Sequence, residues 1–162
     1  IRRPPRSTQG VSSAASDVYK RQAIEAAEKL LDFGVKADIW SITSFNELAR
    51  GGIISDQEKL KDIASKSYVE SCFETKMPTV AVSEYQKLYA EQIRKWVNGD
   101  YICLGTDGFG RSDTREKLRE FFEIDANHIA YNALITCGLK DEARKFKNKY
   151  ELKLNEKDPF TR

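Results

Sequence analysis

The strongest candidate for chemistry is a glycine-rich stretch at residues 105–113, which reads GTDGFGRSD. It lies between a short apolar run and an expected helix start, where backbone amides can hold an anion and Arg111 could add a guanidinium. It matches neither the dinucleotide-binding pattern G-x-G-x-x-G nor the phosphate-loop pattern G-x-x-x-x-G-K-[ST]. The alternative is a tight connection whose glycines only supply positive φ, and spacing alone slightly favours it.

His128 is the only histidine of the chain, and it follows Asp125 on an expected helix. We expect it at a capped surface or boundary position rather than as a general base. A serine triad would need a G-x-S-x-G elbow, which the sequence lacks. Residue types alone therefore indicate no active site.

Three cysteines, Cys72, Cys103 and Cys137, lie far apart without a C-x-x-C pair. Their odd number and spacing argue against a disulfide framework or a zinc site, so we expect buried, reduced thiols in a cytoplasmic protein. Trp40 and Trp96 are expected in the core. The basic run at 144–149 has the spacing of a solvated helix face.

Charge is distributed unevenly along the chain. The net charge is +2, but residues 1–22 hold five basic residues and one acidic residue, which leaves 22 basic and 24 acidic residues in 23–162. The basic balance thus comes from the first segment, and the rest gives no reason to expect a nucleic-acid partner. No run approaches 18 consecutive apolar residues, so we expect no membrane span.

The first 22 residues are rich in Arg, Pro, Ser and Ala and show no apolar periodicity. They lack the apolar centre of a signal peptide, although a basic, serine-rich transit peptide fits the composition. The run SSAASDVYKRQ resembles translated sequencing-adapter DNA. We therefore expect residues 1–22 to be non-native and disordered, and the chain to be a fragment of a protein that extends upstream.

From residue 23 the pattern alternates between helix and strand. We expect helices over 24–31, 44–50, 55–63, 83–97, 114–122, 125–137 and 141–150, and strands over 37–43, 79–82 and 101–104. Two capping pairs, Ser44 with Glu47 and Ser55 with Glu58, suggest that Gly51-Gly52 separates two short helices. The alternation predicts an α/β domain with a mostly parallel sheet covered on both faces.

Apolar stripes identify the helix faces that we expect to be buried. Leu60 and Ile63 are expected to face inward on the helix over 55–63. For the helix over 83–97 the expected stripe is Tyr85, Leu88, Tyr89, Ile93, Trp96 and Val97.

Two stretches point beyond the fold class. Residues 37–50 read ADIWSITSFNELAR, and residues 104–115 read LGTDGFGRSDTR. Together they resemble the C-terminal domain of the homodimeric pyruvate dehydrogenase E1 family, in which near-identical runs occur in this order. Residues 81–94 are similar too, and the resemblance is weakest over 51–78.

The resemblance implies a transketolase C-terminal-like domain over 23–162, with a mixed, mostly parallel sheet and helices on both faces. Such enzymes decarboxylate pyruvate on thiamine diphosphate and pass the acetyl unit to a lipoyl group on the E2 acyltransferase. The cofactor and magnesium lie between the N-terminal and middle domains, at a homodimer interface. Thr106 precedes Asp107-Gly108, and no Asn-Asn pair follows, so the Gly-Asp-Gly…Asn-Asn cofactor signature is not matched. No catalytic, cofactor-binding or metal residue is carried over.

The resemblance implies that this domain has a supporting role. It would pack on the missing domains, contribute to assembly with the second E1 subunit and help to shape the approach of E2. The candidates for an inter-domain contact are Asp107, Arg111, Asp113 and Arg115, since arginine forms bidentate ion pairs that fix register. One alternative is a stand-alone α/β anion-binding or regulatory module that uses residues 105–113. Another is a transketolase-like relative that acts on a different 2-oxo acid.

Overall fold

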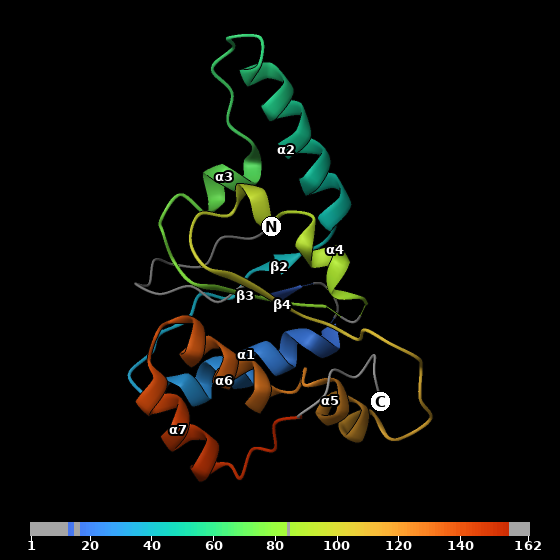
Figure 1. Ribbon diagram of the computed structural model, residues 1–162, viewed down its shortest axis with the longest axis vertical. Coiled ribbons are helices and arrows are strands. Elements are labelled where there is room, and N and C mark those ends of the chain that lie inside the picture. The colour runs from blue at the N-terminus through green and yellow to red at the C-terminus, as the bar shows by residue number, and fades with distance from the viewer. Residues whose placement is uncertain (1–12, 15–16, 84, 156–162) are drawn as a thin grey trace.

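Short parallel strands form the central layer of the computed structural model (Figure 1). β1 (Ser13–Ala14) pairs with β2 (Ser41–Ile42), and β3 (Thr79–Val82) pairs with β4 (Tyr101–Leu104), both in parallel. β1 also lies beside β3, and a helix connects the two strands of each pair, as parallel pairing requires. The structure describes residues 13–14, 17–83 and 85–155.

Helices cover both faces of this layer (Figure 1). One face carries α1 (Asp17–Leu31), α5 (Arg115–Phe122), α6 (Ala126–Thr136) and α7 (Lys140–Lys149). The other carries α2 (Phe45–Lys59), α3 (Tyr68–Cys72), α4 (Lys87–Glu91) and the 3-10 turn η1 (Arg94–Trp96). The predicted α/β class, with a parallel sheet between helices, is confirmed.

Successive residues of β3 contribute to two separate cores. Val80 and Val82 pack in the cluster formed with α1, α6 and α7, whereas Ala81 packs in the cluster on the opposite face. Side chains alternate along a strand, so a strand covered on both sides is apolar throughout. Trp40 and Trp96 both lie in the second cluster, as predicted.

The strongest sequence patterns are confirmed by the structure. β3 and β4 have the predicted bounds, and α6 begins directly after Asp125. Gly34 and Gly138 follow α1 and α6 with φ of +74° and +76°, the left-handed conformation that glycine adopts easily at a helix end.

α2 differs from its prediction because it is one helix that continues through Gly51-Gly52. The Ser44 hydroxyl caps it as predicted, accepting a hydrogen bond from the Glu47 amide at 3.2 Å. Ser55, predicted as a second cap, lies inside the helix and is buried. Leu60, expected to face inward, is 88% exposed at the end of α2, and Ile63 is exposed as well.

The glycine pair has a packing role in α2 instead of ending the helix. A Cβ atom at Gly52 would lie 2.4 Å from ring atoms of Trp96, whereas one at Gly51 would meet nothing within 4 Å. Helix α2 therefore approaches the indole more closely than any side chain at position 52 would permit.

The predicted helix over 83–97 divides into α4 and η1. Ser83 forms a local turn, its hydroxyl accepting from the Tyr85 amide at 3.0 Å, and Gln86 is the residue before α4. The second half of the predicted stripe, Ile93, Trp96 and Val97, is buried, but the first half, Tyr85, Leu88 and Tyr89, is exposed.

Three further boundaries differ from the sequence prediction. The strand expected over 37–43 is reduced to β2. Helix α5 begins one residue later than expected, because Thr114 rather than Asp113 caps it, its hydroxyl accepting from the Lys117 amide at 3.4 Å. Helix α7 starts at Lys140.

Part of the first segment lies among the described residues. The structure places Ser13–Ala14 in β1 and residues 17–22 in α1. Gln22 contacts α6, where its side-chain oxygen accepts a hydrogen bond from the Ala126 amide at 2.9 Å. Residues 1–12 and 15–16 lie outside the described residues.

The contact between Gly52 and Trp96 can be tested with a matched pair of substitutions. We predict that Gly52→Ala lowers the free energy of unfolding by about 1–3 kcal/mol, because the new methyl group collides with a buried ring. Gly51→Ala, one residue away in open space, should raise it by roughly 0.5–1 kcal/mol through helix propensity. Urea unfolding measures both; equal effects of the two substitutions would refute the packing explanation.

Candidate functional site

The glycine-rich stretch leaves the carboxyl end of β4 and is fastened at once to the start of α4. The Thr106 amide donates to the Tyr85 carbonyl at 3.0 Å, and the Lys87 amide donates to the Asp107 carboxylate at 2.9 Å. A Cβ atom at Gly105 would lie 2.6 Å from the Tyr85 carbonyl oxygen, so this close approach requires glycine. The first part of the stretch thus serves a connection inside the domain.

The second part of the stretch is exposed. The Arg111 guanidinium lies 4.3 Å from the centre of the Phe121 ring, a cation–π contact. The Asp113 carboxylate accepts from the Thr114 amide at 2.7 Å and lies 3.9 Å from the Lys117 ammonium. Of the four predicted contact residues, Asp107 therefore faces α4, while Arg111, Asp113 and Arg115 lie on the surface.

An open groove of about 390 Å³ lies next to this connection, at the carboxyl ends of β2 and β3. It is lined by residues 42–46 with Ser83, Tyr85 and Tyr89. The ring centres of Tyr85 and Tyr89 lie 5.6 Å apart. Tyr85 is 67% exposed, Tyr89 is 44% exposed, and the nearby Leu88 on α4 is 69% exposed. The carboxyl edge of a parallel sheet is where such folds commonly bind ligands, and exposed apolar side chains mark contact surfaces.

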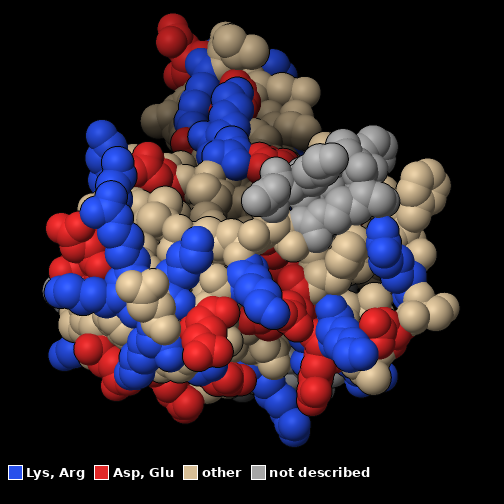
Figure 2. All heavy atoms as spheres, turned by 60° about the horizontal axis from the view of Figure 1, so that its bottom comes forward, with Lys and Arg blue, Asp and Glu red and all other residues tan. Residues whose placement is uncertain are grey.

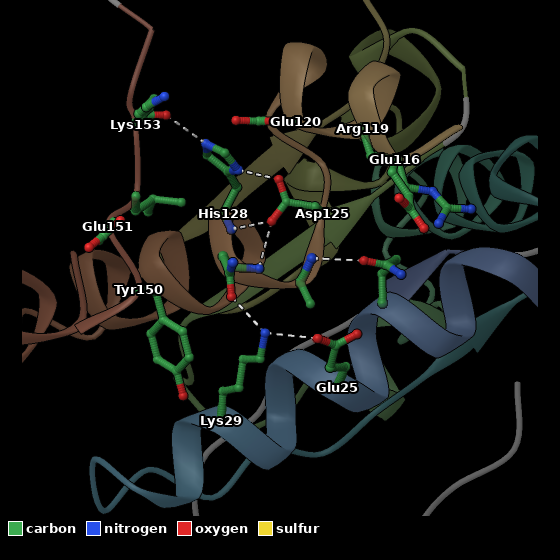
Figure 3. Close-up of a pocket in the computed structure, with 14 residues that line it drawn as sticks. Glu25, Lys29, Glu116, Arg119, Glu120, Asp125, His128, Tyr150, Glu151 and Lys153 are labelled. Carbon is green, nitrogen blue, oxygen red and sulfur yellow. Dashed lines mark hydrogen bonds and ion pairs between the residues drawn. The ribbon is translucent and has the colours of Figure 1, made fainter. Parts of the chain in front are cut away.

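A second, polar cavity of about 470 Å³ was not foreseen from the sequence (Figure 3). It lies among α1, α5, the start of α6 and the residues that follow α7. The charged lining residues are Glu25, Lys29, Glu116, Arg119, Glu120, Asp125, His128, Glu151 and Lys153.

His128 is the buried centre of this polar region, with 1% of its surface exposed. Its Nδ1 atom pairs with the Asp125 carboxylate, and its Nε2 atom lies 3.1 Å from the Lys153 carbonyl oxygen (Figure 3). The expected surface or boundary position is therefore wrong. Both ring nitrogens are engaged, so the imidazole is not placed to act as a general base.

Asp125 and His128 influence each other's ionisation. Burial alone would lower the pKa of His128, but the hydrogen bond and the charge of Asp125 outweigh it and raise that pKa above its ordinary value. Burial alone would raise the pKa of Asp125, but the contacts with His128 hold it below its ordinary value. Both shifts favour the ionised form of the pair, an imidazolium beside a carboxylate.

The amides at the start of α6 are already bonded. Asp125 accepts from the amides of Asn127 and His128 at 2.8 and 3.2 Å, and Gln22 accepts from the amide of Ala126. Spacing offered a signal for the ion pair, because an aspartate at a helix cap carries a second oxygen that can reach the side chain three residues later. Asp125-x-x-His128 has this spacing.

Helix α1 is joined to this network by Lys29. Its ammonium lies 2.8 Å from the Glu25 carboxylate and donates to the Asn127 side-chain oxygen at 2.7 Å (Figure 3). The arrangement holds α1 and α6 together and has no nucleophile beside a free base. Its chemistry is that of a structural polar network.

The thiols only partly match their prediction. Cys103 is buried, and burial raises its pKa to about 12. Cys72 and Cys137 are half-buried, in contrast to the expected full burial. Among residues 13–14, 17–83 and 85–155, no group of three or more His, Cys, Asp or Glu side chains could hold a metal ion.

The charged surface supports the interpretation of the basic run. Arg144, Lys145, Lys147 and Lys149 on α7 are exposed, and Lys149 pairs with Asp32 at 2.9 Å. On the face shown in Figure 2 the positive and negative side chains are interspersed. No helix in the described part of the chain is long and apolar enough to cross a membrane.

Comparison with known proteins identifies the family. Residues 10–125 match the model of the transketolase-like TK C-terminal domain. The chain belongs to this family. The match begins inside the segment of 22 residues that the sequence suggested was non-native, and it ends at the cap of α6.

Curated relatives and solved structures agree with this assignment. A pyruvate dehydrogenase E1 component from Pseudomonas aeruginosa is 50% identical over 118 residues, which are 68% of this chain and 13% of the relative. One from Escherichia coli K12 is 44% identical over 130 residues, 77% of this chain and 14% of the relative. A transketolase from Pichia stipitis superposes with a TM-score of 0.56 at 17% identity, over 85% of this chain and 17% of that chain, which shows the fold alone. The chain thus spans a small part of the relatives it matches.

The role of Asp125 can be tested without removing the helix cap. Asp125→Asn keeps an oxygen for the α6 amides but removes the charge. We predict that the pKa of His128 falls below its wild-type value, because burial is no longer opposed by an anion, and that the free energy of unfolding at pH 6 drops by about 1–3 kcal/mol.

NMR titration of the single histidine and urea unfolding measure these two effects. Asp141→Asn is the matched control, since Asp141 pairs with Arg144 on the surface with both side chains 79% exposed, and it should leave both quantities unchanged. An unaltered His128 pKa in Asp125→Asn would refute the ion pair.

Proposed function

We propose that the chain is the C-terminal assembly domain of a homodimeric-type pyruvate dehydrogenase E1 component. In that enzyme it would support the decarboxylation of pyruvate on thiamine diphosphate and the transfer of the acetyl unit to the lipoyl group of E2. The relatives that are 44–50% identical to this chain are pyruvate dehydrogenase E1 components, which supports this parent enzyme. The partners would be the N-terminal and middle domains, the second subunit and E2, in the cytoplasm, with no nucleic acid or membrane involved.

The described residues do not fit the cofactor or its magnesium ion. A pyrophosphate needs free backbone amides or a metal, but the first three amides of α6 are bonded to Asp125 and Gln22. In the part of the chain that the structure describes, no group of three or more acidic, histidine or cysteine side chains could hold a metal ion. The reaction would therefore take place in other domains, and this domain would act on it through contact.

The observation that carries the proposal is the apolar surface at the carboxyl edge of the sheet. Tyr85, Leu88 and Tyr89 are exposed there, although the sequence places them on an apolar stripe. The same surface is fastened to the glycine-rich stretch through the Tyr85 carbonyl and the Lys87 amide. Apolar side chains that a helix presents to solvent in one domain are covered in an assembled enzyme.

The exposed charges beyond this surface would set the register of the contact. Arg111 is stacked on Phe121, which holds its guanidinium in one place, and a preorganised arginine forms bidentate ion pairs at low entropic cost. Asp107 also orders the start of α4, because its carboxylate accepts a hydrogen bond from the Lys87 amide. A stand-alone anion-binding module would need backbone amides that are available to the anion. The Thr106 and Lys87 amides already donate to Tyr85 and Asp107, which disfavours this alternative.

We also infer that residues 1–22 derive from foreign sequence. Residues 17–22 would then be foreign residues that continue the helix α1 of the parent enzyme. Their position in the helix also allows Gln22 to bond to the Ala126 amide of α6.

Substitution of Arg111 in the full-length enzyme tests the contact. We expect Arg111→Ala to weaken assembly and to lower the rate of acetyl transfer severalfold, because an ordered ion pair between domains is lost. Arg111→Lys should recover only part of the effect, since lysine lacks the planar, bidentate geometry. Arg144→Ala, on the exposed face of α7, is the matched control. Analytical ultracentrifugation and a coupled activity assay provide the readouts, and wild-type behaviour of Arg111→Ala would overturn this role.

The absence of a cofactor site in this domain can be tested on the 162-residue chain itself. Titration calorimetry with thiamine diphosphate and magnesium should give no binding heat, and pyruvate should not be decarboxylated. Saturable binding would contradict the proposed division of labour between domains.

A further inference from the structure

The residues that follow α7 return across the polar cavity as a strap, residues 151–155. The side chain of Leu152 is buried, and its amide donates to the Lys147 carbonyl at 2.9 Å. The Asn155 amide donates to the Glu123 carboxylate at 2.6 Å, and the Asn155 side chain donates to the Phe121 carbonyl at 3.0 Å. Between these two anchors, the Lys153 carbonyl faces His128 (Figure 3).

The two partners of the His128 ring are both hydrogen-bond acceptors. Nδ1 faces the Asp125 carboxylate, and Nε2 faces the Lys153 carbonyl. A neutral imidazole carries one N–H group, so it can satisfy only one of them, whereas the imidazolium satisfies both. The geometry therefore favours the doubly protonated ring when the strap is seated.

We propose that His128 is a proton-dependent latch that holds the strap 151–155 against α6 when protonated and releases it when it loses the Nε2 proton. The Nδ1 proton stays with the charged Asp125, which is the stronger acceptor. After deprotonation the Nε2 lone pair points at the Lys153 carbonyl oxygen, so an attractive contact becomes a repulsive one. Leu152 and Lys153 also line the cavity, so release of the strap opens it further.

The charged groups around the ring influence its protonation. Apart from Asp125 and Lys153, the groups that line this region are Glu25 and Lys29 on α1, Glu116, Arg119 and Glu120 on α5, and Tyr150 and Glu151 after α7, and Glu123 acts on the ring as well. The pKa of His128 is raised above its ordinary value, chiefly by Asp125 acting against burial. A raised pKa in the folded state means that the hold is complete below the unfolded-state value of 6.5 and is lost as the pH rises through the folded-state value.

Hydrogen exchange and a histidine titration on the same untagged 162-residue chain test the latch. His128 is the only histidine, so its NMR signals are unambiguous. We expect the Asn155 amide, after correction for intrinsic base catalysis, to exchange at least about tenfold faster above the His128 pKa than below it. The midpoint of this change should coincide with the His128 titration. Amides in the core of α6, such as those of Ile129 and Leu134, should stay protected throughout.

Two variants separate the latch from a general effect of pH. His128→Gln should abolish the pH dependence of Asn155 exchange. Lys153→Gln is the matched control and should retain it, because Lys153 contributes its backbone carbonyl to the latch. If His128→Gln does not fold, the latch is still tested in the wild-type chain, by whether the midpoint of Asn155 exchange coincides with the His128 titration. Exchange at Asn155 that is independent of His128 ionisation, or that rises together with exchange in α6, would overturn the proposal.

Discussion

The burial of β3 and β4 on both faces is the constraint on which the rest of the structure depends. Val80 and Val82 require a helical layer on one side, and Ala81 with its neighbours requires one on the other. Parallel pairing requires a long crossover connection between the paired strands, and in both pairs this connection is helical. The chain leaves β3 and β4 at the same edge, which brings Tyr85 beside Gly105 and makes this edge the place where the domain presents both apolar and charged groups.

The polar network between α1 and α6 fixes the helical layer on the first of these faces. Asp125 and Gln22 occupy the first amides of α6, and Lys29 joins α1 to Asn127. The network holds a histidine, two carboxylates and a lysine close together, a combination that elsewhere accompanies catalysis. Here the hydrogen bonds cap α6 and join it to α1 and to the residues after α7. A buried histidine can thus have a structural role, which is shown by its hydrogen-bond partners and not by its residue type.

Sequence patterns predict the helices and strands whose bounds are determined by neighbouring residues. β3 and β4 are short apolar runs between turn residues, and α6 begins at an aspartate cap, so their bounds follow from a few neighbouring residues. The glycine at position 52 is explained by Trp96, which is 44 positions away, and no local rule reveals such a contact. The cavity around His128 was missed for the same reason, because Lys153 reaches the ring from a distant part of the chain. The apolar stripe over residues 85–97 follows helical spacing, but only its second half, from Ile93 on, is buried within this chain.

We propose that this domain supports a thiamine enzyme whose chemistry resides in other domains. It is tested most directly by reconstitution, in which the parent enzyme is cut before this domain and the 162-residue chain is added back. Pyruvate decarboxylation is then measured for each piece and for the mixture, with thiamine diphosphate and magnesium present. We expect no activity from the chain alone, weak activity from the cut enzyme and recovery on mixing. Decarboxylation by the chain alone, or full activity of the cut enzyme without it, would refute this role of the domain.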